Sequence, residues 1–275
     1  MRIVLRLLAG IVGLALIAAL VVFAGSEWVL RATHAVEARP VAADHRPQAI
    51  AEGARLAKVM GCTSCHGPAG QGRVIVDSAA LGRIATPAFA RTVTDYSDAE
   101  LARAIRQGVR RDGTGVPIMP TEAFRNLADE DVARLMGWIR SLRPGAGDQL
   151  DHPGYGPVGR LVVLTGAFPL AVQSTVAGPA KRPADPGRYL VETACLSCHA
   201  VHEPREAHDD GRPVPALAEM VPAYDPGAFR TLLATGKGMS GRDLGMMKMA
   251  ARDGLHALTD DEIEAIRRYL VGEAR

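Results

Sequence analysis

The stretch "CTSCHG", Cys62 to Gly67, decides how this sequence is interpreted, and it returns further along the chain as "CLSCHA", Cys195 to Ala200. The chain of 275 residues has four cysteines, and these two stretches contain all of them. Each stretch places two thiols and an imidazole within one short run. Because cysteine occurs nowhere else, the repeat indicates a chemistry that needs these three side chains together, twice.

Two familiar uses of paired cysteines fit this chain poorly. A disulfide framework is typical of short, cysteine-rich chains, whereas this chain is long and cysteine-poor. A structural zinc site needs four ligands, from two cysteine pairs or from one pair plus suitably spaced histidines. One zinc bridging both pairs would leave the two adjacent histidines unexplained.

Covalent attachment of haem c explains the whole pattern, because its signature is C-x-x-C-H. Both thiols bond to one edge of the macrocycle, and the histidine that follows provides an imidazole for the iron. One copy alone also fits a redox dithiol, whereas two copies with no other cysteine favour haem. The sequence therefore predicts two covalently bound haem c groups, attached through Cys62, Cys65, Cys195 and Cys198, with His66 and His199 as iron ligands.

The length and composition of the chain agree with two small domains. A chain of 275 residues has room for two units of about 100–150 residues each. Only 4% of the residues are aromatic, so a cofactor in each unit would supply apolar volume that the side chains lack. The formal net charge is +2, with basic and acidic residues interspersed, which argues against nucleic acid as a partner.

The N-terminal segment predicts where the protein resides. The run from Leu7 to Gly25 is uncharged and has the length of a membrane-crossing helix, about 20 residues. Arg2 and Arg6 precede it, so the positive-inside rule puts the N-terminus in the cytoplasm, and Trp28 follows where an interfacial anchor would lie. We expect a single-pass protein of a bacterial inner membrane with its domains in the periplasm. The alternative is a signal peptide cleaved after Val22–Ala24, although its apolar region would be unusually long.

The segments that precede the two motifs repeat each other. A helix predicted from Pro47 carries small and apolar residues on one face, and the segment before the second motif has the same pattern. These residues are Gly53, Leu56, Ala57 and Met60 in the first copy and Gly187, Leu190, Val191 and Ala194 in the second. Because a glycine has the same phase in both copies, we expect another helix to approach each of these helices closely.

The segments that close the two halves also repeat. "NLADEDVARLMGWI" from Asn126 aligns without a gap with "ALTDDEIEAIRRYL" from Ala257. Acidic residues at the start of both favour helix N-termini, and capping boxes are predicted at Ser97–Glu100 and Thr259–Glu262. Each half is therefore predicted to contain a helix, a haem motif, a loop, a short helix, a methionine-bearing loop and a closing helix, which indicates an internal duplication.

These patterns divide the chain into five parts. We predict a transmembrane anchor at residues 1–30, a tether at 31–46, a first domain at 47–145, a linker at 146–182 and a second domain at 183–275. Within the linker, the run from Arg160 to Val172 is apolar but too short to span a bilayer, and Pro169 would break a helix. Either this run is a connector packed on the two domains, or it lies on the membrane or docks a partner.

Each half resembles a class I cytochrome c domain. The first half does so through "CTSCHGPAGQG", "ATPAF", "YSDAELARAIRQGVRRDG", "PIMP" and "LADEDVARLMGWIRSLRP", and the second through "GRYLVETACLSCHA", "RDLGMM" and "HALTDDEIEAIRRYL". The resemblance implies an all-α fold of two tandem domains, in which the first and last helices cross and loops wall the haem pocket. The first half is more similar to the cytochrome c subunits of membrane-bound periplasmic dehydrogenases for alcohols, aldehydes and sugar acids. Those subunits commonly carry three haem motifs, where this chain has two.

Methionines before the closing helices are the candidate second ligands of the irons. Met119 lies in "VPIMPTEAF", between prolines that stiffen the loop, whereas Met60 and Met136 lie on predicted helices and are expected to pack in the core. In the second half, spacing alone does not choose among Met239, Met246, Met247 and Met249. The resemblance does choose, since in similar domains the ligand is the methionine two residues after the glycine of an "LG-x-M" stretch, which is Met247.

The predicted ligands indicate an electron carrier rather than an enzyme. An iron held by histidine and methionine has no open position for a substrate, and methionine raises its potential. We expect transfer from a dehydrogenase or a quinol-oxidising complex to an oxidase or a soluble cytochrome. The alternative is a dihaem peroxidase-like enzyme, in which His202 or His208 would replace methionine or act as an acid and base. A sensor would bring an output domain, and the sequence shows none.

Overall fold

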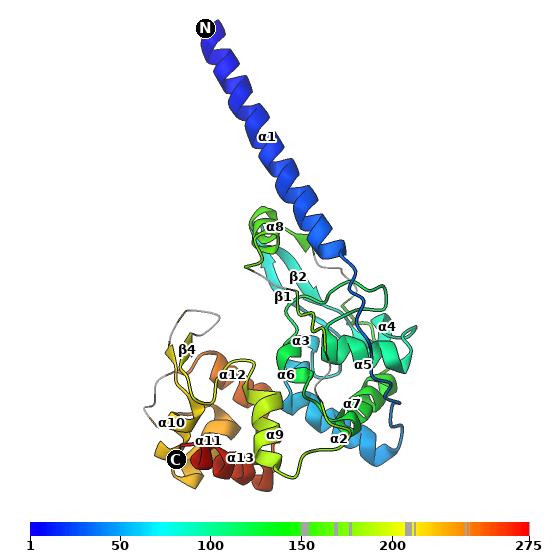
Figure 1. Ribbon diagram of the computed structural model, residues 1–275, viewed down its shortest axis with the longest axis vertical. Coiled ribbons are helices and arrows are strands. Elements are labelled where there is room, and N and C mark those ends of the chain that lie inside the picture. Colours follow the sequence, from blue (N-terminus) through cyan, green and yellow to red (C-terminus); the bar gives the residue numbers. More distant parts are fainter. Residues whose placement is uncertain are drawn as a thin grey trace.

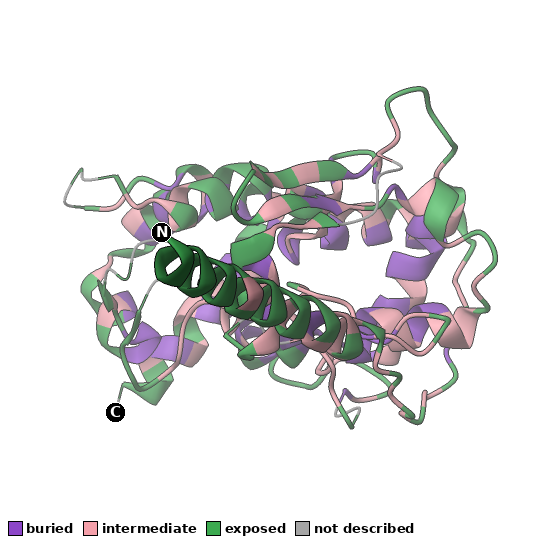
Figure 2. Cartoon of the chain, turned by 90° about the horizontal axis from the view of Figure 1, so that it is seen from above, coloured by how far each residue is buried: buried purple, intermediate pink, exposed green. Residues whose placement is uncertain are grey.

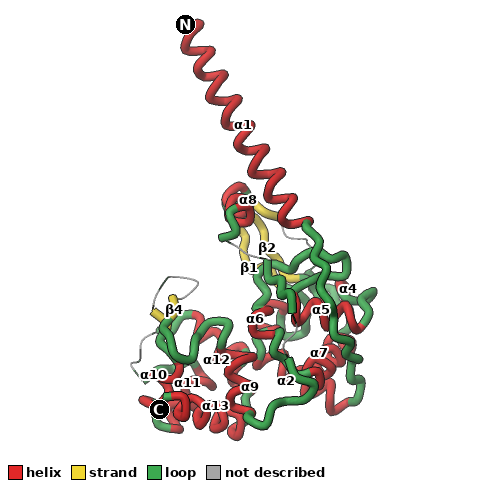
Figure 3. The backbone as a smooth tube through the Cα atoms, viewed as in Figure 1, coloured by secondary structure: helices red, strands yellow, loops and turns green. Residues whose placement is uncertain are grey.

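The computed structural model describes residues 1–149, 154–167, 170–175, 178–206, 211, 213–239, 241 and 243–274 of the chain. Figure 1 shows two helical units next to each other, with one long helix leading away from the first of them. Most of both units is helical, as predicted, and Figure 3 shows a few short strands among the helices.

The N-terminal helix α1 (Arg2–Arg31) extends away from both units. It is long and apolar enough to cross a membrane, with a mean hydropathy of 2.9 over its most apolar stretch, and the rest of the protein does not cover that stretch. Figure 2, which views the molecule from above, shows α1 exposed over nearly its whole length. So much exposed apolar surface is unusual in a soluble protein, and it supports the predicted membrane helix.

The tether was predicted at residues 31–46; in the structure Arg31 is the last residue of α1, and residues 32–46 form no helix. The Ala43 N–H donates a 2.7 Å hydrogen bond to the Asp98 carboxylate. Val41 is buried in the hydrophobic core of the first unit. The segment that joins α1 to the first unit is therefore attached to it rather than freely extended.

The first unit is built from short helices and two strands around a core. Its elements are α2 (Pro47–Val59), α3 (Cys62–His66), β1 (Arg73–Ser78), β2 (Gly82–Thr86), α4 (Phe89–Thr92), α5 (Asp98–Gln107), α6 (Thr121–Phe124) and α7 (Asp129–Ser141). Helices α2 and α7 cross in close contact. A Cβ atom at Gly53 would overlap the carbonyl oxygen of Arg134 and lie 3.1 Å from the Cβ atom of Trp138, so this approach requires glycine.

The second unit repeats this crossing. Its elements are α9 (Pro186–Leu190), η1 (Val191–Cys195), β4 (Arg205–Glu206), β5 (Pro213–Val214), α10 (Leu217–Met220), η2 (Val221–Ala223), α11 (Pro226–Thr235), α12 (Met246–Asp253), η3 (Leu255–Ala257) and α13 (Asp260–Glu273). Helix α9 crosses α13, where a Cβ atom at Gly187 would overlap the carbonyl oxygen of Ala265 and lie 3.0 Å from the Cβ atom of Tyr269. Tyr269 aligns with Trp138, so both crossings have the same register. The predicted close approach of two helices in each unit is confirmed.

Two predicted helix starts are also confirmed. At α5 the Ser97 hydroxyl accepts a hydrogen bond from the Glu100 N–H, and the Glu100 carboxylate accepts one from the Ser97 N–H at 2.8 Å. Thr259 and Glu262 exchange the same two bonds at the start of α13. These reciprocal bonds satisfy backbone N–H groups that have no partner inside the helix, which fixes where each helix begins.

The structure contains two small antiparallel sheets, which the predicted all-α fold did not include. In the first sheet, β2 pairs with β1 and also with β3 (Gly154–Tyr155) from the linker, in the order β1-β2-β3. Gly82 faces Tyr155 in this register. The second sheet pairs β4 with β5 after the second motif. Apart from β3, the strands lie between the motif and the next helix of their unit, and the crossing of the first and last helices is unchanged.

The described part of the linker packs on α1 and on the first unit. Helix α8 (Pro157–Leu164) lies against the end of α1, as Figure 1 shows. The chain then returns along the first unit, where the Ala171 N–H donates to the Val116 carbonyl at 2.9 Å. Pro169, which was expected to end a helix, lies outside the described residues, and α8 ends before it.

Direct contacts hold the two units together. The Arg55 guanidinium of α2 forms a two-pronged ion pair with Glu262 of α13, with N–O distances of 2.7 and 2.8 Å. The Tyr189 hydroxyl of α9 donates a 2.7 Å hydrogen bond to Asp131 of α7, and both side chains are buried. One hydrophobic core includes residues of both units. The two units therefore pack as one body.

Candidate haem sites

The first motif forms a single short helix, α3. Helix α2 ends just before Gly61, which turns the chain with a left-handed backbone at φ +75°, and Gly67 ends α3 at φ +81°. Glycine is favoured at both positions because other residues are strained at a positive φ. The two turns isolate Cys62, Cys65 and His66 on one helical turn.

His66 is oriented to bind a metal through one ring nitrogen. Its Nδ1 lies 3.1 Å from the carbonyl oxygen of Pro87, which assigns the proton to Nδ1 as a hydrogen-bond donor. Nε2 then keeps its lone pair, as an iron ligand requires. The ring stacks on Phe89 with centroids 4.2 Å apart, and Phe89 meets the edge of Trp138 from the closing helix. Burial lowers the pKa of His66, which keeps the imidazole in the neutral form that binds metals.

The four motif cysteines are free thiols. Burial raises the pKa of Cys62 to about 12, and it raises the pKa of Cys65 as well. The Thr86 hydroxyl holds the end of the first motif by donating a 2.6 Å hydrogen bond to the Cys65 carbonyl. Within the described part of the chain, no three His, Cys, Asp or Glu side chains converge on a common metal site.

The second motif continues from its helix without a glycine. Helix α9 passes into the π-helical turn η1, which ends at Cys195, and the His199 N–H donates a 3.0 Å hydrogen bond to the Cys195 carbonyl. Burial raises the pKa of Cys195 to about 12 and lowers the pKa of His199. The Pro215 carbonyl partly offsets this lowering of the His199 pKa, as the Pro87 carbonyl does for His66. His199 Nδ1 nevertheless has no hydrogen bond of normal geometry to any described residue. The two histidines thus have similar surroundings on different local backbones.

Met119 follows a strained residue. Ile118 has a left-handed backbone at φ +63°, and it is the one described residue other than glycine with a positive φ. A β-branched side chain disfavours this conformation, and such strain is typical of functional sites. Met119 is half-buried and packs against the hydrophobic core. Met60 and Met136 are buried in that core, as the sequence predicts.

The four candidate methionines of the second unit differ in burial. Met239, Met246 and Met249 expose 59%, 37% and 50% of their surface. Met247 is half-buried and packs against the hydrophobic core. It lies in the first turn of α12, directly after the turn made by Gly245 at φ +54°. Met247 is therefore the least exposed of the four, and its assignment as a ligand stays a prediction.

One of the two histidines after the second motif, His202, lies in the described part of the chain, and its position does not favour the peroxidase alternative. The His202 side chain is 62% exposed, and its Nε2 lies 3.1 Å from the Glu273 carboxylate near the C-terminus. His202 is therefore a paired surface residue. His208 lies outside the described residues.

The segment that carries Met247 lies near the first motif. Helix α12, which carries Met247, lies against α3, which carries the first motif. The adjacent turn η3 packs on α2, where a Cβ atom at Gly254 would overlap the carbonyl oxygen of Lys58 just before the first motif. No local sequence pattern indicates this contact, because it joins distant segments. The sequence also did not reveal that Pro87 and Phe89 contact His66. The stretch "ATPAF" carries the resemblance to the cytochrome family, but only the fold shows that it lies against this histidine.

Comparisons with known families agree with this division of the chain. Residues 50–143 match the family described as cytochrome c. Residues 182–270 match the family described as cytochrome c oxidase, cbb3-type, subunit III. Each match includes one C-x-x-C-H motif and most of the closing helix of its unit.

Three relatives carry similar domains. The chain is 28% identical over 273 residues to the fructose dehydrogenase cytochrome subunit of Gluconobacter japonicus, a match that covers 83% of this chain and 53% of the relative. It is 28% identical over 240 residues to the gluconate 2-dehydrogenase cytochrome c subunit of Pantoea cypripedii, covering 80% and 51%. A shorter match, 32% over 98 residues, is to the cbb3-type cytochrome c oxidase subunit CcoP of Helicobacter pylori (strain 52), covering 36% and 30%.

The chain spans about half the length of the two dehydrogenase subunits that it matches. The two family matches fall on the two units of the fold, and each unit contains one complete motif with a half-buried histidine. The two cytochrome c domains support haem binding and electron transfer. The chain therefore has two successive cytochrome c domains and is a relative of the cytochrome subunits of fructose and gluconate dehydrogenases.

Proposed function

We propose that this protein is a membrane-anchored dihaem c-type cytochrome that carries electrons from a dehydrogenase or a quinol-oxidising complex to a respiratory acceptor. The acceptor is an oxidase or a soluble cytochrome. Two cytochrome c domains, each with one complete C-x-x-C-H motif, support a haem count of two. The relatives include two dehydrogenase subunits and one oxidase subunit, which supports redox enzymes as the partners.

The residues of both sites fit covalent haem c. Both sites offer free thiols next to an imidazole, which are the donors that attachment and ligation require, and at His66 the Nδ1 hydrogen bond also leaves Nε2 unprotonated. The first site would use Cys62, Cys65, His66 and Met119, and the second Cys195, Cys198, His199 and Met247. Bound haem would supply one-electron transfer, with no iron position left for a substrate.

The observation that carries the proposal is the contact between α12 of the second domain and α3 of the first. This contact puts the segment with Met247 beside the segment with Cys62 and Cys65. The Arg55–Glu262 ion pair and the buried Tyr189–Asp131 hydrogen bond hold the two domains in this arrangement. A chain that relays electrons between two centres needs its two sites held at a constant, short separation, and these contacts serve that end.

The same proposal assigns the protein to a bacterial inner membrane, with its domains in the periplasm. Helix α1 would be the single membrane-spanning segment, since it has the required length and hydropathy. Arg2 and Arg6 precede its uncharged run and favour the cytoplasmic side for the N-terminus. Both haem sites would then lie on the side opposite to the N-terminus.

Haem content and ligation test this function. The purified full-length protein should contain two covalently bound haems per chain, and replacing Cys62 and Cys65 by Ala should leave one. Replacing Cys195 and Cys198 by Ala is the matched variant and should leave the other. A carrier should also show the near-infrared charge-transfer band of methionine–iron ligation for both haems and no turnover of hydrogen peroxide. One haem per chain, or a high-spin haem that consumes peroxide, would contradict the proposal.

A further inference from the structure

Helix α8 of the linker is fixed to the end of α1 by specific contacts. The Arg160 guanidinium lies 2.8 Å from the Glu27 carboxylate and donates a 3.0 Å hydrogen bond to the Ser26 hydroxyl. Ser26 is fully buried. Gly25 lets the two helices approach, since a Cβ atom there would lie 2.7 Å from Leu164 Cδ1. These contacts hold α8 at one level along α1.

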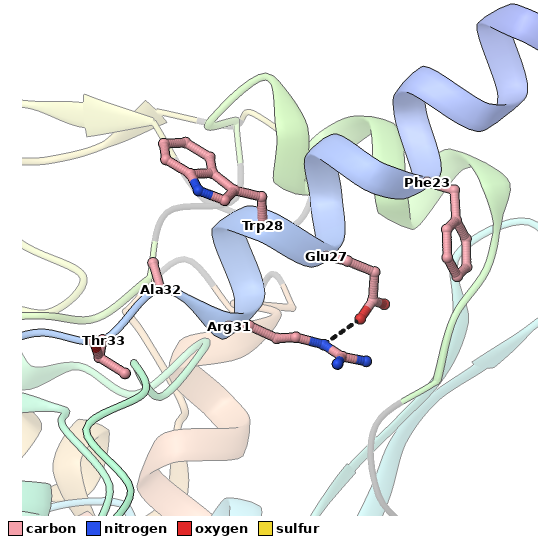
Figure 4. Close-up of a pocket in the computed structure, with 6 residues that line it drawn as sticks. All are labelled: Phe23, Glu27, Trp28, Arg31, Ala32 and Thr33. Atoms are coloured by element: carbon pink, nitrogen blue, oxygen red, sulfur yellow. Dashed lines mark hydrogen bonds and ion pairs between the residues drawn. The ribbon is translucent and has the colours of Figure 1, made fainter.

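That level is where α1 would leave a bilayer. The uncharged run from Leu7 to Gly25 is about 28 Å long at about 1.5 Å per residue, close to the hydrocarbon thickness of about 30 Å. Glu27 is the first charged residue after this run, so its pair with Arg160 falls at the depth of the lipid headgroups. Trp28 is 78% exposed, and Figure 4 shows its ring on one side of α1 while Glu27 and Arg31 point to another. Tryptophan favours this depth in membranes.

The outer face of α8 is apolar and uncovered. Val158 and Leu161 expose 46% and 47% of their surface, and their spacing puts them on the same face of the helix. Arg160 is the one charged residue of α8, and its pair with Glu27 turns it toward α1. Apolar residues on the exposed face, with no free charge on the helix, suit contact with lipid.

We infer that α8 is an interfacial helix that lies in the headgroup region beside the exit of α1, with Val158 and Leu161 against phospholipid. This inference rests on the membrane anchor proposed above. Lipid is the expected occupant because α8 is fixed at Ser26 and Glu27, directly next to the apolar stretch of the anchor. Strand β3 directly precedes α8 and pairs with β2 of the first domain, so the contact would orient that domain on the membrane surface.

Nitroxide labels on the full-length, haem-loaded protein in phospholipid nanodiscs test the inference. Single cysteines are introduced as Leu161→Cys in α8, Leu14→Cys in α1 and Glu219→Cys, an exposed position on α10 of the second domain. Power-saturation EPR then compares collisions with oxygen, which concentrates in lipid, and with a nickel chelate, which stays in water. The oxygen-to-nickel ratio at position 161 should be several-fold higher than at position 219 and lower than at position 14. Val158→Cys provides a second reading on the same face.

The four labelled positions separate failure of α8 from failure of the anchor. If labels at 158 and 161 are as accessible to nickel as the label at 219, the inference is overturned. A lipid signal at position 14 in that case leaves the anchor intact, whereas a water signal there refutes the anchor as well. Labels at 158 and 161 that are shielded from both reagents would indicate a protein partner on this face and would also overturn the inference.

Discussion

The Tyr189 hydroxyl donates a 2.7 Å hydrogen bond to Oδ2 of Asp131 across the boundary between the two cytochrome c domains, and both side chains are buried. The same hydroxyl accepts a 3.0 Å hydrogen bond from the Ala128 N–H. Asp131 also pairs with Arg134 of its own helix at 2.7 Å and with Arg182 of the linker at 2.6 Å. One buried carboxylate is thus shared by both domains and the linker, so removing a partner would leave buried polar groups unsatisfied.

Replacing Tyr189 by Phe should loosen the domain interface. The change removes the acceptor of the buried Ala128 N–H and one donor to Asp131, which should cost about 1–3 kcal/mol of unfolding free energy. Denaturant unfolding of the haem-loaded protein, followed by haem absorbance, measures this loss. Tyr269→Phe is the control, because no described residue hydrogen-bonds to its hydroxyl. Equal stabilities for the two variants would contradict the role given to Tyr189.

A second contact across the boundary depends on pH. Burial alone would raise the pKa of Glu262, but hydrogen bonds from Arg55 and from the Thr259 backbone hold it below the ordinary value of 4.5. A carboxyl with a lowered pKa stabilises the folded state above pH 4.5, and this stabilisation is lost as the pH falls through the lowered pKa. Glu262→Gln removes the charge that faces Arg55 while a glutamine keeps the capping box of α13.

We therefore expect Glu262→Gln to lower the free energy of unfolding at neutral pH. The difference from the unmodified protein should shrink as the pH falls below 4.5, because protonation then removes the same charge from the unmodified protein. Chemical denaturation over a series of pH values measures this difference. Glu264→Gln is the control, since Glu264 belongs to a more exposed pair with Arg267 on the same helix and should contribute little at any pH. A difference that stays constant with pH would argue against the ion pair as its source.

The helix crossings give a prediction that tests the duplication itself. Gly53→Ala and Gly187→Ala each place a Cβ atom against a backbone carbonyl of the closing helix, so each should lower stability by about 1–3 kcal/mol or more. Thermal unfolding of the two variants measures the loss. Gly272→Ala on α13 is the control, because its Cβ atom would meet nothing within 4 Å. A Gly53→Ala protein as stable as the Gly272→Ala protein would mean that α2 and α7 do not need this close approach.

The crossings were predictable from the sequence because their signal is local and repeated. Gly53 and Gly187 occupy the same phase of an apolar helix face, and the closing helices align without a gap. The capping boxes at Ser97 and Thr259 are likewise complete within four consecutive residues, so the sequence alone locates both helix starts. Local propensity and tertiary packing agree at these places, and the predictions were confirmed.

Contacts between distant segments were not predictable in this way. Strand β2 pairs with β3, with Gly82 of β2 opposite Tyr155 of β3. No short-range sequence pattern encodes that pairing. Arg55 and Glu262 resemble ordinary solvated charges until the fold places them together. The choice of Met247 needed the resemblance to the cytochrome family, because spacing alone leaves four methionines equivalent. Burial is the property that separates them, and burial depends on the whole fold.

Met119→Ala should leave the first haem attached through Cys62 and Cys65 but open its iron to carbon monoxide. The reason is that the thioethers and His66 do not depend on the distal ligand, whereas the sixth position does. Optical spectra of the reduced protein, with and without carbon monoxide, measure the change. Met239→Ala, at an exposed position, should bind no carbon monoxide. An unchanged spectrum and no binding in Met119→Ala would rule out this ligand.

The second distal ligand is tested by replacing neighbouring methionines one at a time. Met247→Ala should lower the potential of the second haem sharply, because methionine ligation is what holds such a potential high. Met246→Ala and Met249→Ala are matched controls on the same helix, and their more exposed side chains should be dispensable for ligation. Spectroelectrochemical titration of each variant resolves the two haems if their potentials differ. If the potential is preserved in Met247→Ala but lowered in Met246→Ala or Met249→Ala, then that neighbour, and not Met247, is the ligand.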